Sequence, residues 1–275
     1  MIKVENISFA YPMDVKALED VSVEINEGEF VAVMGENGAG KTTLAKHLNG
    51  LLKPDFGRVL IDGVDTRISS VASLSRIVGL VFQNPNHQLF CGDVEDELTF
   101  ALRNYGFDAE LSKERVERVL KLLRIEKYRS SPPLMLSEGE KKRVALACVL
   151  AWQPKFLVID EPTIGQDADF KRQLRSLFMQ LTNQGKTVIT VTHDVEFIAE
   201  CSPRVIILSH GRVAADGPAK QILTNEDLIE KTSLTLPQTA ELFHSLSDLN
   251  FPKETIDIYE AFTYIKKRYG RYKKL

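Results

Sequence analysis

The sequence predicts an α/β fold with a mostly parallel sheet covered by helices. After residue 152, short apolar segments typical of strands alternate with segments typical of helices, a pattern that favours parallel strands joined by helices. Earlier, the apolar run at 30–34 leads through a glycine-rich loop into a helical pattern. The chain of 275 residues is long enough for one large α/β domain with a small appendage.

The elements are expected in a definite order. Residues 2–34 hold β-branched and aromatic segments (IKVENISF, VSVEI, EFVAVM) separated by turn signals, and they are expected to form strands. The remaining elements expected are a helix from 41 to about 52, strands at RVLIDG and RIVGLVF, helices between about 94 and 152, the strand FLVID, a helix near 169–183, the strand TVITVT, a helix near 194–201, and the strand VIILS with a hairpin at RVAADG. Beyond residue 217 only helices are expected, best at 237–248 and 254–268.

Composition narrows the classes of function. The net charge of −3 gives no general reason to expect nucleic-acid binding. Cys91, Cys148 and Cys201 are widely spaced, so we expect buried, reduced thiols in a cytosolic protein, with no disulfide or zinc framework. The start of the chain lacks the pattern of a signal peptide. The longest apolar run, 144–152, is far shorter than the roughly 20 residues that span a bilayer.

The loop GENGAGKTT at residues 35–43 has the pattern of a phosphate-binding loop, with the required strand before it and helix after it. Its glycines allow several backbone N–H groups to converge on phosphates, and the following helix adds its dipole. Lys41 supplies a positive charge, and the Thr42 hydroxyl can bind Mg²⁺. The predicted nucleotide-binding residues of this loop are Gly35, Asn37, Gly38, Gly40, Lys41, Thr42 and Thr43.

Two acids follow a buried strand at FLVIDE. A carboxylate at the end of such a strand can bind the metal ion of a nucleotide, which predicts this role for Asp160. Its neighbour Glu161 is then free to orient or deprotonate a water molecule. The alternative is a pair of acids at a surface turn, which the phosphate-binding loop upstream disfavours.

The stretch LSEGE at residues 136–140 admits two interpretations. Ser137 and Glu140 have the spacing of a capping box, and both glutamates suit the positive end of a helix dipole. The same N–H groups could instead form half of a nucleotide site.

Taken together, these motifs resemble those of ATP-binding cassette (ABC) ATPases, in the order of that family and over residues 3–217. The resemblance implies a P-loop NTPase fold with an antiparallel β subdomain, an inserted helical subdomain at about 88–152 and a separate region from 218 to 275. The residues that match family positions are Tyr11 (adenine stacking), Gln83 (Mg²⁺ contact and sensing of the membrane partner), Asp160 and Glu161 (metal ligand and catalytic base), Asp167 (dimer interface) and His193 (γ-phosphate contact).

LSEGE stands where the family has LSGGQ. By this resemblance, Ser137, Gly139 and Glu140 would face the γ-phosphate of the nucleotide bound by a second subunit. Glu138 and Glu140 depart from the family pattern, and carboxylates near a triphosphate are repulsive unless they point away. The catalytic residues implied for this chain's own pocket are Glu161, His193 and Lys41.

The segment QNPNHQ at 83–88 and the later SLTLPQTAELFHSL are similar to the ATPases of energy-coupling factor (ECF) importers, as is TIGQD at 163–167. This resemblance implies an ATPase that uses ATP and Mg²⁺ to power uptake of a vitamin or transition-metal ion. Its partners would be a second ABC ATPase (a paralogue or an identical copy), a transmembrane scaffold and a substrate-binding membrane protein. Gln88 would lie near the groove for the scaffold, residues 218–275 would support dimerisation, and the protein would sit peripherally on the cytoplasmic face of the cell membrane.

Two other functions stay open. One is a soluble cassette ATPase acting on DNA, ribosomes or an assembly machine, although the chain has neither a long coiled coil nor a second cassette. The other is a regulatory nucleotide-binding subunit. The basic end of the chain, KKRYGRYKKL, is either a solvated tail or a segment attracted to anionic lipid.

Overall fold

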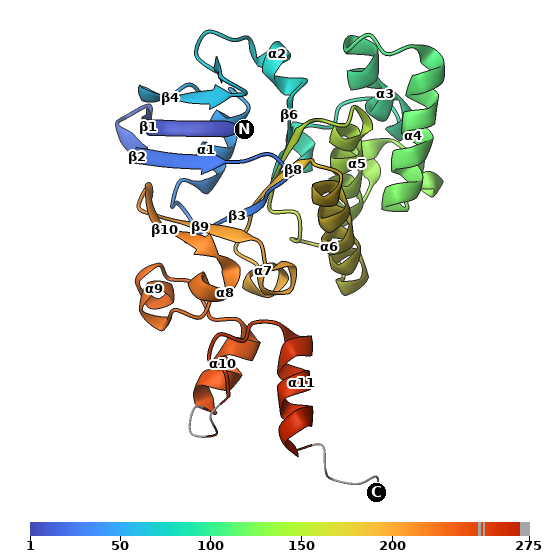
Figure 1. The fold of residues 1–275 in the computed structure, drawn as a ribbon. Coiled ribbons are helices and arrows are strands. Elements are labelled where there is room, and N and C mark those ends of the chain that lie inside the picture. The colour runs from blue at the N-terminus through green and yellow to red at the C-terminus, as the bar shows by residue number, and fades with distance from the viewer. Residues whose placement is uncertain (247–248, 250, 270–275) are drawn as a thin grey trace, which may run out of the picture.

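A computed structural model describes residues 1–246, 249 and 251–269. It contains two sheets with helices packed around them (Figure 1). The first sheet is antiparallel, with the strand order β2-β1-β4-β5. Its strands are β1 (Ile2–Tyr11), β2 (Val15–Ile25), β4 (Phe56–Ile61) and β5 (Val64–Asp65).

The second sheet has the order β10-β9-β3-β8-β7-β6, and only the pair β9–β10 is antiparallel. Its strands are β3 (Phe30–Met34), β6 (Val78–Val81), β7 (Phe156–Asp160), β8 (Thr187–Val191), β9 (Arg204–Ser209) and β10 (Arg212–Pro218). Because β3 and β7 both lie beside β8, the loops that follow these three parallel strands meet at one edge of the sheet.

Successive residues of the central strands pack on opposite faces of this sheet, as the pleat requires. Met34 and Ile159 belong to the cluster formed with α5, α6 and α7, whereas Val33 and Val158 pack with α1 and the antiparallel sheet. The strands are therefore buried on both sides, which explains their continuous apolar sequences. The bounds of these helices are α1 (Lys41–Leu48), α5 (Glu138–Ala151), α6 (Ala168–Asn183) and α7 (Val195–Cys201).

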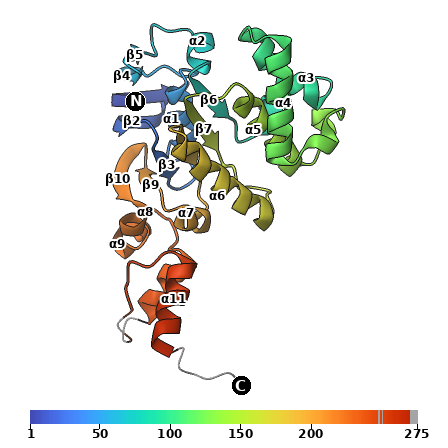
Figure 2. The ribbon, with the colours of Figure 1, turned by 45° about the vertical axis from the view of Figure 1, so that its right-hand side comes forward.

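The segment between β6 and β7 is largely helical, as expected, and forms one side of the molecule (Figure 2). Here α3 (Val94–Asn104) and α4 (Ala109–Leu123) pack beside α5, and the stripe Val116, Val119, Leu120 and Leu123 is buried. Three short 3₁₀ turns occur in this region, at Pro85–His87, Glu126–Tyr128 and Pro133–Met135.

After β10, the described residues form α8 (Ala219–Ile222), α9 (Glu226–Lys231), α10 (Gln238–Ser245) and α11 (Ile258–Tyr269). Figure 1 shows α10 and α11 projecting from the rest of the molecule. Ala219, Ile222 and Ile229 belong to the large core, whereas Phe243, Phe251 and Ala261 form a small core of their own. The domain boundary between residues 217 and 218 stays a prediction. Within the described residues, α8 and α9 pack with the core that precedes this boundary.

Several boundaries differ from expectation. The first helix ends at Leu48 instead of about residue 52, since Gly50 turns the chain with φ of 75°. The last helix begins at Ile258 instead of residue 254. The short helix α2 (Val71–Ser75), capped by Ser70, was not expected. The helix expected at 237–248 starts at Gln238, and residues 247 and 248 lie outside the described part, as does most of the basic end.

The three cysteines are free thiols, of which Cys148 and Cys201 are buried. Cys91 is only half-buried, so the expectation of burial was wrong for this residue. Within the described residues, no helix has the length and apolar character needed to cross a membrane.

Candidate nucleotide-binding and catalytic site

The loop at 35–43 connects β3 to α1, and glycine is required at two of its positions. A Cβ atom on Gly35 would lie 2.1 Å from the carbonyl oxygen of Leu208, and one on Gly40 would lie 2.4 Å from that of Ala17. Both glycines also have φ values, 144° and 100°, that L-residues rarely adopt. The loop therefore packs tightly against the backbone of Ala17 and Leu208, which leaves no room for a side chain at these two positions.

Lys41 is buried at the start of α1. Its Nζ donates to the carbonyl oxygens of Gly35 and Glu36, each at 2.8 Å, so the ammonium group lies within the curve of the loop. Burial lowers the pKa of Lys41, and the carboxylates of Glu161 and Asp160 oppose that shift. The ammonium group of Lys41 thus places a positive charge within the loop, where it can attract a phosphate.

A cleft of about 350 Å³ opens over this loop. Among the predicted residues, it is lined by Tyr11, Asn37, Gly38, Gly40, Lys41, Thr42, Thr43, Gln83, Asp160 and Glu161. The Tyr11 hydroxyl lies 3.2 Å from Thr43 Oγ1, so the tyrosine stands beside the first turn of α1. Val15, Lys16 and Ala17 complete one wall and were not expected. The turn signal at Tyr11-Pro12, which folds β2 back beside Tyr11, could have indicated them.

The residues predicted to hold Mg²⁺ have suitable geometry. Thr42 Oγ1 donates to Asp160 Oδ2 at 2.7 Å. Asp160 Oδ1 is buried and has no hydrogen-bond partner among the described residues, although a buried acceptor normally has one. Gln83 lines the same cleft. A carboxylate, a hydroxyl and an amide oxygen form the hard oxygen set that Mg²⁺ prefers, so these residues fit the ion.

Glu161 is held tightly at the end of β7. It is 5% exposed and has φ of 51°, in the left-handed region that non-glycine residues rarely adopt. Thr192 Oγ1 donates to its Oε2 at 3.1 Å, and His193 Nδ1 lies 2.7 Å from its Oε1. Both partners follow β8, so the sheet places His193 and Glu161 together although they are far apart in sequence.

LSEGE starts α5, and the capping box forms. Glu140 Oε2 accepts from the backbone N–H of Ser137 at 2.9 Å and from its hydroxyl at 2.7 Å. The other carboxylate oxygen of Glu140 accepts from the hydroxyl of Tyr128. The Tyr128 and Ser137 donors lower the pKa of Glu140 to about 2. The Glu140 carboxylate is thus turned back onto its own helix, while Glu138 pairs with Lys141 at 3.0 Å.

Asp167 lies beside this motif in the same chain. It caps α6 by accepting from the backbone N–H of Phe170 at 2.8 Å and pairs with Arg143 of α5 at 3.0 Å. The backbone N–H of Phe170 and the charge of Arg143 lower the pKa of Asp167. Gln166 Nε2 donates to the carbonyl oxygen of Gly139 at 3.0 Å.

Gln88 lies in the loop after β6 and joins two elements. Its Nε2 donates to the carbonyl oxygen of Ala145 in α5 at 2.9 Å, and its Oε1 accepts from the N–H of Phe82 at 3.3 Å. Gly35, Gln88, His193, Asp167 and the residues of LSEGE are not among the described residues that line the cleft. His193 adjoins the cleft through its contact with Glu161, whereas LSEGE, Asp167 and Gln88 lie on α5 or contact it.

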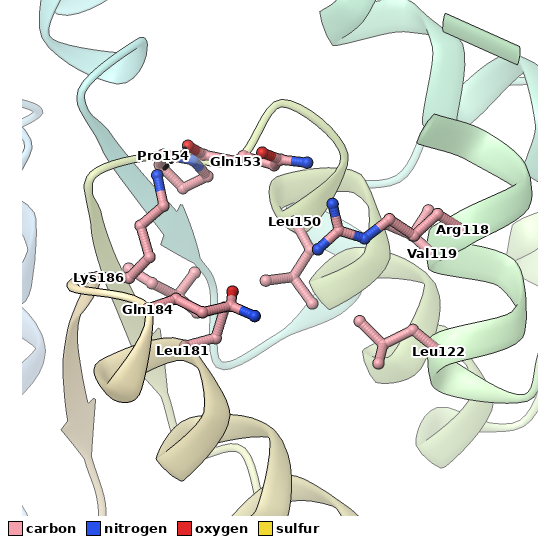
Figure 3. Close-up of a pocket in the computed structure, with 10 residues that line it drawn as sticks. Arg118, Val119, Leu122, Leu150, Gln153, Pro154, Leu181, Gln184 and Lys186 are labelled. Atoms are coloured by element: carbon pink, nitrogen blue, oxygen red, sulfur yellow. Dashed lines mark hydrogen bonds between the residues drawn. The ribbon is translucent and has the colours of Figure 1, made fainter. Parts of the chain in front are cut away.

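A second hollow lies where the ends of α4, α5 and α6 meet (Figure 3). It is lined by residues such as Val119, Leu150 and Leu181 and has a volume of about 50 Å³. That is room for a water molecule or two and is far too small for a nucleotide. None of the predicted site residues lines it.

The comparison with protein families agrees with this geometry. Residues 18–164, which contain the loop, LSEGE and both acids, match the family model described as ABC transporter. The chain belongs to the ABC transporter family. As an ABC ATPase, it has the P-loop fold with the antiparallel and helical subdomains that the sequence predicts.

Individual relatives indicate the same family. The energy-coupling factor transporter ATP-binding protein EcfA of Methanothermobacter thermautotrophicus is 40% identical over 253 residues, covering 91% of this chain and 81% of that protein. EcfA2 of Clostridium tetani is 37% identical over 259 residues, with 91% and 90% covered. A further relative, from Caldanaerobacter subterraneus subsp. tengcongensis, is 38% identical over 246 residues, and this ABC ATPase spans only 43% of its length.

Solved structures give the same family. CbiO1 from Clostridium perfringens, part of the ABC transporter complex cbiONQ, has a TM-score of 0.73 and 34% identity, covering 88% of this chain and 98% of CbiO1. A dimeric ATP-binding cassette in a post-hydrolysis state with ADP and Pi has a TM-score of 0.72 and 32% identity, covering 80% and 99%. The fold of this ABC ATPase is thus one that binds nucleotide and forms dimers in a relative.

Proposed function

We propose that this chain is the ATPase subunit of an ECF-type importer, in which ATP-driven closure of a head-to-tail ATPase dimer powers uptake of a vitamin or transition-metal ion. The observation that carries the ATPase activity is the cleft in which Lys41, Thr42, Asp160 and Glu161 converge. The identity to EcfA over 91% of the chain and the QNPNHQ segment support the transporter type.

Each residue has a distinct task in this proposal. Tyr11 stacks on the adenine, and the N–H groups of the loop together with Lys41 bind the phosphates. Thr42, Asp160 and Gln83 hold Mg²⁺, which supplies charge neutralisation when bound. Glu161 orients the attacking water and takes its proton. His193, hydrogen-bonded to Glu161, keeps the carboxylate aligned and faces the γ-phosphate.

The other predicted residues act at interfaces. Ser137 and Gly139 face the nucleotide of the second subunit, and Asp167 lies at the boundary between subunits. Gln88 lies beside the groove for the transmembrane scaffold, and residues 218–275 support dimerisation. The chain is then peripheral to the membrane, on its cytoplasmic face, through contact with the scaffold.

The proposal is tested by purifying the tagged chain from membranes of its native host in mild detergent and identifying what accompanies it. A small polytopic scaffold, a second ATPase and a substrate-binding membrane protein are expected. Recovery with soluble partners alone would contradict the importer proposal and favour a soluble assembly. Glu161→Gln is expected to abolish ATP turnover by the complex, and unchanged turnover would instead identify a regulatory subunit.

A further inference from the structure

Most contacts that hold Glu161 come from the end of β8 and the two residues that follow it. Its N–H donates to the carbonyl oxygen of Val191 at 2.8 Å, and its carboxylate is held by Thr192 and His193. Its backbone is nevertheless in the left-handed region, which is unfavourable for a residue with a side chain and persists only when the surroundings enforce it. The carbonyl group of Glu161 is the remaining polar group of this residue.

That carbonyl is held by a different element. Lys142 of α5 donates from Nζ to the Glu161 oxygen at 2.9 Å. The space around these two residues, bordered by Leu146, Phe170 and Leu174, amounts to about 10 Å³. A cavity of that size is at the lower limit for one water molecule, so the direct contact has little competition from solvent. Burial lowers the pKa of Lys142, and the Glu161 and Asp160 carboxylates oppose the shift.

The helix that carries Lys142 also contacts two other predicted sites. Ser137 is its N-cap, and Gln88 binds its backbone at Ala145. From Val144 to Ala151 the helix is buried in the large core, and close packing of this kind transmits strain. A displacement of α5 at either contact therefore reaches Lys142.

We propose that Lys142 is a positioning residue, which fixes the peptide group of the catalytic Glu161 and links it to the helix facing the partner's nucleotide. The inference rests on the proposed function. It assigns to Lys142 a role that does not follow from the sequence motifs. When α5 shifts on engagement of Ser137, the hydrogen bond from Lys142 turns the Glu161 peptide and with it the carboxylate. Catalysis in this chain's pocket then depends on the state of α5.

The test uses the complex purified as described above, with ATP turnover measured against ATP concentration. Lys142→Met keeps the apolar stem and removes the donor. We expect kcat to fall about tenfold, which corresponds to about 1.4 kcal/mol, with KM for ATP unchanged because Lys142 does not touch the nucleotide cleft. Lys142→Arg offers a donor of similar reach and is expected to recover most of the rate.

Lys121→Met is the control. Lys121 is an exposed lysine of α4 and contacts neither Glu161 nor LSEGE, so kcat should change little. Thermal unfolding of each variant identifies damage to the fold, which would lower Tm, and Lys142→Gln serves if Lys142→Met is unstable. If Glu161→Gln abolishes turnover but both Lys142→Met and Lys142→Gln retain full kcat, the inference is wrong. If Glu161→Gln leaves turnover intact, the proposed function fails instead.

Discussion

The orientation of the Glu140 side chain affects how the LSEGE motif can act. Its carboxylate would repel a triphosphate if it pointed outward, but it accepts hydrogen bonds from Ser137 and Tyr128 and lies over its own helix. These contacts also engage the Ser137 hydroxyl, the group predicted to reach the partner's nucleotide. Ser137 and Glu140 therefore cap α5 within their own subunit. A phosphate that binds the Ser137 hydroxyl has to compete with the Glu140 carboxylate.

Glu140 should make stability depend on acid pH. Its pKa is lowered to about 2 in the folded chain, against about 4.3 for an unperturbed glutamate. A lowered pKa means that the stabilisation is fully present above about pH 4.3 and is lost as pH falls toward 2. Urea unfolding of the wild type and of Glu140→Gln should therefore show a free-energy difference that shrinks over this range. A difference that is constant with pH would contradict this assignment.

Gly139→Ala should disturb the neighbouring loop. The added Cβ would lie 2.8 Å from the carbonyl oxygen of Gly165, which precedes Asp167. Overpacking of this kind typically costs about 1–3 kcal/mol, so Tm should fall by several degrees. Gly92→Ala is the control, because a Cβ there has no atom within 4 Å. Equal Tm values for the two variants would show that the loop yields without strain.

At the scale of elements, the parallel strands decide which motifs meet. β8 lies between β3 and β7, so the residues that follow all three strands converge at one edge of the sheet. The helix α5 then contacts three of the predicted sites: Ser137 of LSEGE is its N-cap, Gln88 binds its backbone at Ala145, and its Lys142 binds the carbonyl oxygen of Glu161.

Gln88→Ala should loosen the loop after β6. The N–H of Phe82 donates to Gln88 Oε1 and the Gln88 amide binds α5, so loss of the side chain frees both ends of the loop. Hydrogen–deuterium exchange at Phe82 is expected to become faster, and any stimulation of ATP turnover by the proposed transmembrane scaffold to weaken. His87→Ala, in the same loop, should leave exchange at Phe82 unchanged. Unaltered exchange in Gln88→Ala would exclude this bracing role.

At the scale of the whole molecule, the C-terminal helices extend beyond the nucleotide-binding core. They have a small core of their own, and the ion pair between Lys220 and Glu260 ties α11 to α8. Apolar side chains on α11 stay outward, with Ile258 60% and Phe262 62% exposed. Such a surface suits contact with a second subunit.

Replacing Ile258 and Phe262 by Glu should weaken subunit pairing while leaving nucleotide affinity and Tm unchanged, since both side chains are exposed and neither lines the nucleotide cleft. Sedimentation velocity with ATP, in the Glu161→Gln background, measures the pairing. Ile68→Glu, at a residue 87% exposed on the antiparallel-sheet side of the chain, controls for the change in polarity. Equal pairing in all three proteins would rule out a dimerisation role for this face.

The sequence by itself determined what depends on local chemistry. The strand, glycine loop and helix around Lys41 follow from neighbouring residues, as do the buried strand ending at Asp160 and the helix start at Ser137. The fold class and the family were predictable because these local units recur in a characteristic order. Helix ends were less predictable, as at Leu48, where a glycine turn competes with the helical pattern.

Only the tertiary structure decided which distant side chains touch. Tyr128 holds Glu140, Lys142 holds the Glu161 backbone, and Val15, Lys16 and Ala17 complete the cleft. No sequence periodicity indicates these contacts, because they depend on how separate elements pack. They also depend on which polar groups still lack a partner after the local hydrogen bonds have formed. Local motifs determine the type of site, whereas long-range packing determines how its side chains are aligned and how the site is linked to α5.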